Sequence, residues 1–199
     1  MNCYPGAGTP VKSGARVLGV DDAPFQRGRD RWTYLVGLLF RGPVLERAVK
    51  RRVAVDGDDA TRAVIDMVDG LSGEVKLIMS HGTVTAGFNV LDLWEIYGAT
   101  SVPIISVVDR MPDMERVRRA LEHRGLEERM EVLSRNPNYV RVRTRMGEVY
   151  ACWVGIGERE VVAILNRTCV ESRLPEPVRI AHIVAGLLSD PPGLGNGHF

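Results

Sequence analysis

The sequence predicts an α/β fold in which a mixed β-sheet is flanked by helices. Apolar runs at 16–22 and 32–40, and a third that ends at 53–55, follow one another without a helical segment, which is typical of an antiparallel meander. Later apolar runs at 76–80 and 102–108 are separated by helical patterns, which favours parallel strands joined by crossovers. The order β-β-β-α-β-α-β is the ribonuclease-H-like arrangement.

The first half of the chain supplies three strands and a helix. Arg16–Asp22 and Trp32–Phe40 are predicted strands because both are short runs dominated by apolar residues. A helix is predicted over 59–69, where either Asp58 or Asp59 is placed to cap its N-terminus. Its apolar positions recur at helical spacing and are Ala60, Ala63, Val64, Met67 and Val68.

The second half alternates helical and strand patterns. A short helix is predicted over 90–97, and an amphipathic helix is predicted over 114–121. Residues 139–154 predict a hairpin, and two further helices are predicted at 160–166 and 178–188.

We expect a single ribonuclease-H-like domain over residues 16–188. A chain of 199 residues suits one domain and can bury a substantial core. Residues 1–15 and 189–199 are rich in Gly and Pro and lack apolar periodicity, so a flexible N-terminal segment and a flexible C-terminal tail are expected.

Composition excludes several classes of protein. The chain carries 26 Lys and Arg against 25 Asp and Glu, so it is not a polycation that binds nucleic acid through bulk charge. No run approaches the ~18–20 apolar residues that span a bilayer, and the N-terminus lacks the layout of a secretory signal. We therefore expect a cytoplasmic protein with no membrane partner.

The three cysteines are too few and too widely spaced for a disulfide scaffold or a Cys-x-x-Cys zinc site. We expect Cys3, Cys152 and Cys169 to be mostly reduced. The dominance of Arg over Lys is compatible with a heat-adapted source, in which a Cys152–Cys169 disulfide could form, but genomic base composition produces the same skew.

Asp21 and Asp22 end the first predicted strand. Because a strand alternates its faces, one carboxylate points to each side of the sheet. A carboxylate at the end of a strand could hold a divalent cation together with acids from neighbouring strands. The alternative is a simple turn, in which Asp22 and Pro24 end the strand.

An acidic segment, residues 53–69, contains five acids and one Arg, a local charge of −4. Crowded carboxylates repel one another unless a cation or a proton intervenes, which indicates a metal site. We take Asp56 as the candidate ligand and assign one of Asp58 and Asp59 to helix capping, which needs no function.

His81 lies in a turn directly after the fourth predicted strand. The predicted strand order places this turn beside the first strand, so His81 and Asp21 could converge. His81 could then ligate a metal or donate a proton, although a lone His in a turn is more often a surface or hydrogen-bonded residue. His182, near Arg179, is interpreted as a packed or hydrogen-bonded helix residue.

A basic segment, residues 109–145, contains ten Arg and seven acids, a balance of +3. Its last part places Arg141, Arg143 and Arg145 on one face of a predicted strand. A row of guanidinium groups can bind phosphate oxygens bidentately, which indicates contact with nucleic acid. A solvated strand face paired with acids is the alternative.

Four separated sequence blocks lie between residues 16 and 188: Val17–Phe25, Val55–Thr61, Gly87–Asp92 and Leu174–His182. Together they resemble the endonuclease dU family, which is mainly archaeal and related to endonuclease V. The resemblance implies an endonuclease-V-like core and divalent-metal-dependent cleavage of phosphodiester bonds near deaminated bases. It also implies that Asp21 matches the metal carboxylate of the first strand and that Asp56 is the second acid.

The turn after the fourth strand departs from this family pattern, which has Asp-Gly where the chain has His81-Gly82. An imidazole binds Mg²⁺ less well than a carboxylate does and suits borderline metals such as Mn²⁺ or Zn²⁺ better. The predicted function is a Mg²⁺- or Mn²⁺-dependent nuclease with Asp21, Asp56 and His81 as metal ligands and catalytic residues. The arginine row at 141–145 would contact the nucleic-acid partner.

Two other functions are compatible with the sequence. The presence of His81 where the family pattern has Asp favours a catalytically inactive nucleic-acid-binding protein of the same fold. Its binding to nucleic acid would weaken as the salt concentration rises. A metal- or small-ligand-binding protein without a nucleic-acid partner is the third interpretation. An open sheet also leaves an exposed edge, so a homodimer is a reasonable expectation.

Overall fold

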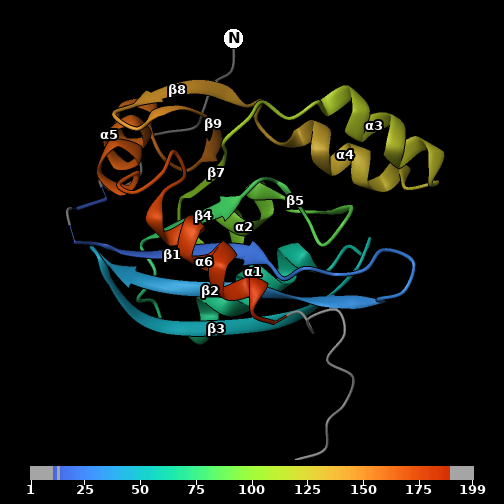
Figure 1. Ribbon diagram of the computed structural model, residues 1–199, viewed down its shortest axis with the longest axis horizontal. Coiled ribbons are helices and arrows are strands. Elements are labelled where there is room, and N and C mark those ends of the chain that lie inside the picture. The colour runs from blue at the N-terminus through green and yellow to red at the C-terminus, as the bar shows by residue number, and fades with distance from the viewer. Residues whose placement is uncertain (1–10, 13, 189–199) are drawn as a thin grey trace, which may run out of the picture.

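Seven strands form one mixed sheet in the computed structural model, which describes residues 11–12 and 14–188 (Figure 1). The segments predicted to be flexible, 1–15 and 189–199, lie mostly outside the described residues. The strands of the sheet are β1 (Arg16–Asp22), β2 (Trp32–Arg41), β3 (Val44–Ala54), β4 (Leu77–His81), β7 (Ile104–Val108), β8 (Val140–Thr144) and β9 (Gly147–Val154).

The order of strands across the sheet is β3-β2-β1-β4-β7-β9-β8. β1, β2 and β3 form the predicted antiparallel meander, and β4 and β7 then add to β1 in parallel. The predicted hairpin over 139–154 is confirmed, because β8 and β9 pair antiparallel and β9 pairs with β7. The mixed sheet of the predicted fold class is therefore present.

Helices cover both faces of the sheet (Figure 1). They are α1 (Ala60–Gly70), α2 (Leu93–Thr100), α3 (Met114–His123), α4 (Glu127–Arg135), α5 (Glu158–Thr168) and α6 (Glu176–Gly186). α1 and α2 pack on one face, and α5 and α6 pack on the other. α3 and α4 form a hairpin that extends beyond the sheet (Figure 1). No helix in the described part of the chain is long and apolar enough to cross a membrane.

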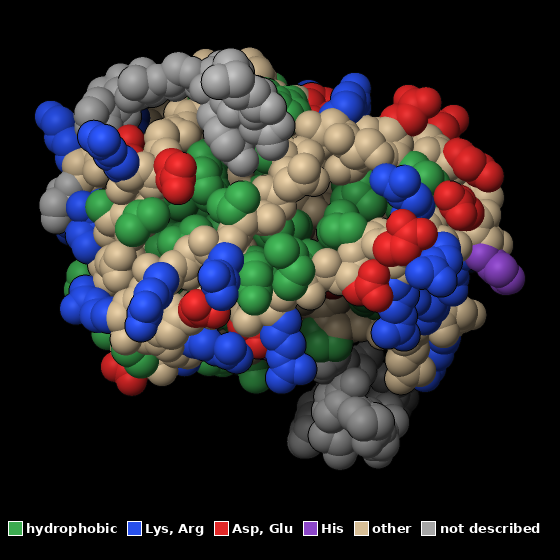
Figure 2. Space-filling view, turned by 90° about the horizontal axis from the view of Figure 1, so that it is seen from above, with side chains coloured by type: hydrophobic (Ala, Val, Ile, Leu, Met, Phe, Trp, Pro, Cys, Tyr) green, Lys and Arg blue, Asp and Glu red, His purple; other side chains and the backbone are tan. Residues whose placement is uncertain are grey.

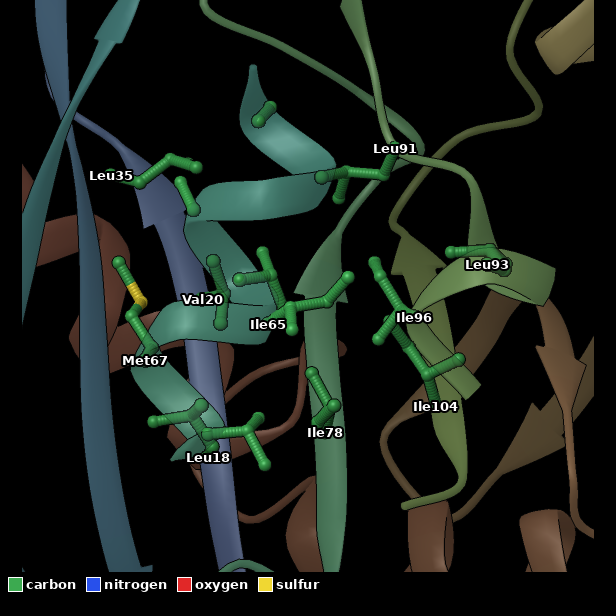
Figure 3. Close-up of a cluster of buried hydrophobic side chains, with 14 of the residues drawn as sticks. Leu18, Val20, Leu35, Ile65, Met67, Ile78, Leu91, Leu93, Ile96 and Ile104 are labelled. Atoms are coloured by element: carbon green, nitrogen blue, oxygen red, sulfur yellow. The ribbon is translucent and has the colours of Figure 1, made fainter. Parts of the chain in front are cut away.

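The core beneath α1 explains why the central strands read as continuous apolar runs. Leu18 and Val20 of β1 and Ile78 of β4 pack against Ile65 and Met67 of α1, and all five side chains are buried (Figure 3). Helices on both faces leave the central strands no solvated side, so apolar residues are favoured at every position.

The other face of β1 is covered by α6. Val17 belongs to the apolar cluster on that side, and Asp21 shares its face because side chains two residues apart point the same way. α6 approaches β1 closely, since a Cβ at Gly19 would lie only 2.1 Å from the carbonyl oxygen of Pro177. The missing side chain at Gly19 therefore lets α6 lie directly over the end of β1.

Two short elements differ from the sequence predictions. The helix predicted over 90–97 begins only at Leu93 and ends at Thr100, because Asn89–Val90 forms β6, which pairs with β5 (Val84–Thr85). The sequence prediction also lacked α4, whose helical positions carry no buried side chain. Without a buried apolar stripe, a helix leaves little periodic signal in the sequence.

The start of α1 is stabilised in a different way from the predicted cap. Asp59 occupies the N-cap position, but its side chain makes no capping hydrogen bond. Its carboxylate instead accepts hydrogen bonds from the Ala54 N–H and from the Asn89 amide. The amide oxygen of Asn89 accepts the Ala60 N–H, so a residue 29 positions away caps the helix.

Cys152 and Cys169 are both buried and both free. This agrees with the prediction that they are reduced, and the Cys152–Cys169 disulfide is not formed in the structure. Cys3 lies outside the described residues.

Candidate metal centre

Three side chains converge at the C-terminal end of β1. The Oδ2 atom of Asp21 lies 3.2 Å from Nδ1 of His81 and 2.8 Å from Nδ1 of His182. The two imidazole rings are nearly perpendicular, with an interplanar angle of 82°. The structure therefore confirms the predicted convergence of Asp21 and His81 and adds His182 to it.

The fold positions these residues through three different elements. β1 and β4 are parallel neighbours in which Val20 pairs with Ser80, so Asp21 and His81 follow as the next pair along the two strands. His182 comes from α6, which the close approach at Gly19 holds over β1.

The cluster is buried at its base and open on one side. The side chain of Asp21 is only 4% exposed, that of His81 is 28% exposed and that of His182 is 66% exposed. The hydrogen bond to Asp21 raises the pKa of His81, and burial partly opposes this shift. The charges of Asp109 and Asp22 raise the same pKa further.

The geometry is compatible with one bound divalent cation. One ligand atom from each of Asp21, His81 and His182 lies within 4.8 Å of the other two. Ligand atoms at about 2.0–2.2 Å from one ion lie about 2.8–3.6 Å apart at right-angle or tetrahedral geometry. The two distances from Asp21 to the imidazole nitrogens, 3.2 and 2.8 Å, fall in that range.

Asp22 points to the opposite face, as strand alternation predicts. Its carboxylate accepts hydrogen bonds from the Thr85 hydroxyl and the Ala86 N–H. Burial raises the pKa of Asp22 despite these bonds. Asp22 therefore anchors the β5 turn, while its own N–H donates to Oδ1 of Asp21 and orients that carboxylate.

Asp56 makes a different set of contacts. Its carboxylate accepts a hydrogen bond from the Phe88 N–H and pairs with Arg124 at 2.9 Å and Arg27 at 3.7 Å. Both guanidinium groups also lie over the Phe88 ring. The described cluster of potential ligands does not include Asp56, so its role as a ligand stays a prediction.

The arginine row lies on the sheet face away from the cluster. Val142 belongs to the apolar cluster under α5, on the Asp21 side, so Arg141 and Arg143 alternate to the other face. Both are exposed, and Arg141 lies 3.5 Å from Glu148. Arg145 is in the hairpin turn, where it donates to the Asn166 carbonyl oxygen. Nucleic-acid contact by this row stays a prediction.

His182 is the functional candidate whose role the sequence interpretation missed. The interpretation as a hydrogen-bonded helix residue was correct, but its partner is Asp21, 161 positions away. No local pattern identifies such a partner. The available signal was the sequence block Leu174–His182, which resembled the endonuclease dU family and ended at this residue.

The sequence matches the endonuclease dU family over residues 13–189. The chain belongs to this family. A UPF0215 protein of Methanothermobacter thermautotrophicus is 39% identical to this chain over 180 residues, and the match covers 88% of this chain and 88% of that protein.

The fold of this chain is similar to that of solved endonuclease V structures. A protein of unknown function from Archaeoglobus fulgidus has a TM-score of 0.76 and 31% identity, covering 85% of this chain and 95% of that one. Endonuclease V of Ciona intestinalis, in complex with a 24mer DNA containing an inosine followed by a ribo-adenosine, has a TM-score of 0.55 and 9% identity. That match covers 84% of this chain and 82% of the other, and at this identity it concerns the fold alone.

Proposed function

We propose that this endonuclease dU protein is a metal-dependent nuclease that hydrolyses phosphodiester bonds in nucleic acid containing deaminated bases. The observation that carries the proposal is the convergence of Asp21, His81 and His182 at the end of β1. An endonuclease V of the same fold, crystallised with inosine-containing DNA, supports the substrate class.

The three converging residues would hold one divalent cation. Such a cation would stabilise negative charge on the scissile phosphate and lower the pKa of a water molecule. The Asp22 N–H holds Oδ1 of Asp21 at 2.9 Å, which leaves Oδ2 directed at the two imidazoles. Because His182 is the most exposed of the three, the phosphodiester would approach from its side.

The remaining predicted residues keep subsidiary roles in this proposal. Asp56 would act as the second acid, and phosphate groups would compete with it for Arg27 and Arg124, because both cations bind phosphate oxygens well. The arginines at 141–145 would contact the nucleic-acid backbone beyond the cleavage site.

A cleavage assay tests the nuclease function. Purified protein is incubated with uracil- or inosine-containing DNA and RNA in the presence of Mg²⁺ or Mn²⁺. We expect Asp21→Asn to reduce cleavage at least ~100-fold, since even mutating the partners of metal ligands costs about 10- to 100-fold. Asp56→Asn is tested in parallel.

The matched control is Asp66→Asn, which removes a carboxylate that pairs with Arg62 on the surface of α1. This variant should cleave like the unmodified protein. Absence of cutting by the unmodified protein, or cutting that Asp21→Asn leaves intact, contradicts the nuclease proposal.

A catalytically inactive nucleic-acid-binding protein is the second candidate. It is favoured by His81, an imidazole at a position where the family resemblance implies a carboxylate. In that case the protein would bind the same oligonucleotides in a salt-dependent manner without turnover.

A further inference from the structure

We infer that the Asp21–His81–His182 cluster selects a single borderline transition-metal ion, with Zn²⁺ as the representative case, over Mg²⁺. This inference takes the site's location from the proposed function but does not depend on cleavage. The donor set is two imidazole nitrogens and one carboxylate oxygen. Mg²⁺ favours oxygen ligands, whereas imidazole suits Zn²⁺ and other first-row transition ions.

The surroundings provide for one cation and not for a pair. Asp22 and Asp109 are the other acids whose charges raise the pKa of His81. The Asp22 carboxylate is turned to the β5 turn, where Thr85 and Ala86 bind it. Asp109 pairs with Arg173. Among the described acids around the cluster, Asp21 is then the one whose carboxylate faces both imidazoles, and one carboxylate offers too little negative charge for two divalent ions.

The three residues would leave part of the ion's coordination shell unfilled by protein. Three protein ligands leave at least one position for water or a phosphate oxygen, which is the arrangement of catalytic zinc sites. The hydrogen bond from the Asp22 N–H to Oδ1 of Asp21 orients the carboxylate so that Oδ2 faces the two imidazoles. Exposure of His182 gives the ion a route from solvent.

Metal titration of the chelator-treated full chain tests the inference. Isothermal titration calorimetry with Zn²⁺, Mn²⁺ and Mg²⁺ separately should give one Zn²⁺ site per chain and at least ~100-fold weaker Mg²⁺ binding. Co²⁺ serves as a spectroscopic probe, since its visible absorption reports the ligands. His182→Ala should weaken Zn²⁺ binding at least tenfold and alter the Co²⁺ spectrum.

His81→Asp is the decisive variant, because it should raise the affinity for Mg²⁺ while lowering that for Zn²⁺. His123→Ala, which removes an imidazole at the end of α3, is the matched control and should change neither affinity. Thermal unfolding without metal verifies that each variant is folded. Equal Mg²⁺ and Zn²⁺ affinities, two ions per chain, or no change in preference for His81→Asp would overturn the inference. None of these readouts requires cleavage, so the nuclease proposal can fail separately.

A second inference comes from an aromatic and cationic surface on β2 and β3, formed by Trp32, Tyr34, Lys50 and Arg52. Nζ of Lys50 lies 4.3 Å from the centre of the Tyr34 ring, and the Arg52 guanidinium carbon lies 5.1 Å from that of Trp32. Trp32 is 45% exposed. Neither cation forms an ion pair with any described residue.

This surface lies on the same face of the sheet as the metal cluster. Asp21 pairs with Val36, and Val36 pairs with Lys50, so the three side chains form one row across β1, β2 and β3. Two strand spacings separate Lys50 from Asp21, about 10 Å. The geometry points to this surface as a binding platform for single-stranded nucleic acid, whose bases stack on aromatic rings and whose phosphates bind cations.

Binding of a fluorescent single-stranded oligonucleotide tests the platform, with Asp21→Asn protein in chelator so that cleavage does not interfere. The double variant Lys50→Ala, Arg52→Ala should bind more weakly. The slope of the logarithm of its binding constant against the logarithm of the salt concentration should be shallower by about 1.4, because two phosphate contacts are lost on a single strand. Trp32→Ala should weaken binding about tenfold through lost stacking.

The control double variant, Arg62→Ala with Arg118→Ala, removes the same charge from two exposed helix positions and should leave the slope unchanged. An unchanged slope for the Lys50 and Arg52 variant, or an equal effect of the control, would overturn this inference.

Discussion

At the scale of single residues, donor chemistry and its orientation decide what the site can bind. Asp21 is positioned by strand alternation, which sends its neighbour Asp22 to the opposite face. His81 contributes nitrogen where the family resemblance implies oxygen, and His182 adds a second nitrogen. A carboxylate with two imidazoles is a donor set for transition ions, so the identity of two residues changes the expected cofactor.

The buried thiols lead to a prediction at the same scale. Burial raises the pKa of Cys152 and that of Cys169 to about 12. The thiolate is the reactive form, so at pH 8 both should react with iodoacetamide at least ~100-fold more slowly than a free cysteine of pKa about 8.5. Mass spectrometry of a Cys3→Ser variant measures this, and unfolding in urea should expose both thiols. Rapid labelling of the folded variant contradicts the prediction.

At the scale of elements, α6 is the part that completes the cluster. It packs on β1 through Pro177 and on β2 through two small residues, Ala181 and Ala185, and it carries His182 to Asp21. The contact depends on Gly19, because any side chain there would overlap Pro177. The candidate metal centre therefore depends on the packing between a strand and a helix from opposite ends of the chain.

Gly19→Ala should displace α6 from β1. We expect a loss of about 3 kcal/mol in the free energy of unfolding, at the upper end of typical overpacking costs. Weaker Zn²⁺ binding should accompany it, since His182 moves with the helix. Chemical denaturation and calorimetry measure the two effects.

The control is Gly98→Ala in α2, where an added Cβ meets no atom within 4 Å. That variant should be stabilised by up to about 1 kcal/mol, because Ala is favoured over Gly within a helix. If both variants had equal stability and metal affinity, the role assigned to Gly19 would be wrong.

At the scale of the whole molecule, the acidic and basic segments bind each other. Arg124 pairs with Asp56, and Arg129 donates to the Gly57 carbonyl oxygen, so the α3–α4 hairpin is docked on the acidic segment. On the right of Figure 2, where this hairpin lies, acidic and basic side chains are intermixed. Part of the charge separation seen in the sequence therefore serves packing between elements.

Much of the fold could be predicted because the relevant signals are local. Apolar runs and helical spacing are short-range patterns, and the rules of strand connection then place β4 beside β1. That adjacency brought Asp21 and His81 together in the prediction. The cap of α1 could not be predicted, because Asn89 reaches it from 29 positions away.

The sequence by itself determined the antiparallel meander, the parallel addition of the next strands and one pair of the site, Asp21 with His81, because these follow from periodicity and the rules of strand connection. Only the tertiary structure decided the third member, His182, and the pairing of Asp56 with arginines. It also placed Lys50 on the Asp21 face and Arg141 on the other. These outcomes depend on how distant segments pack, and packing depends on shape and volume that no local pattern encodes.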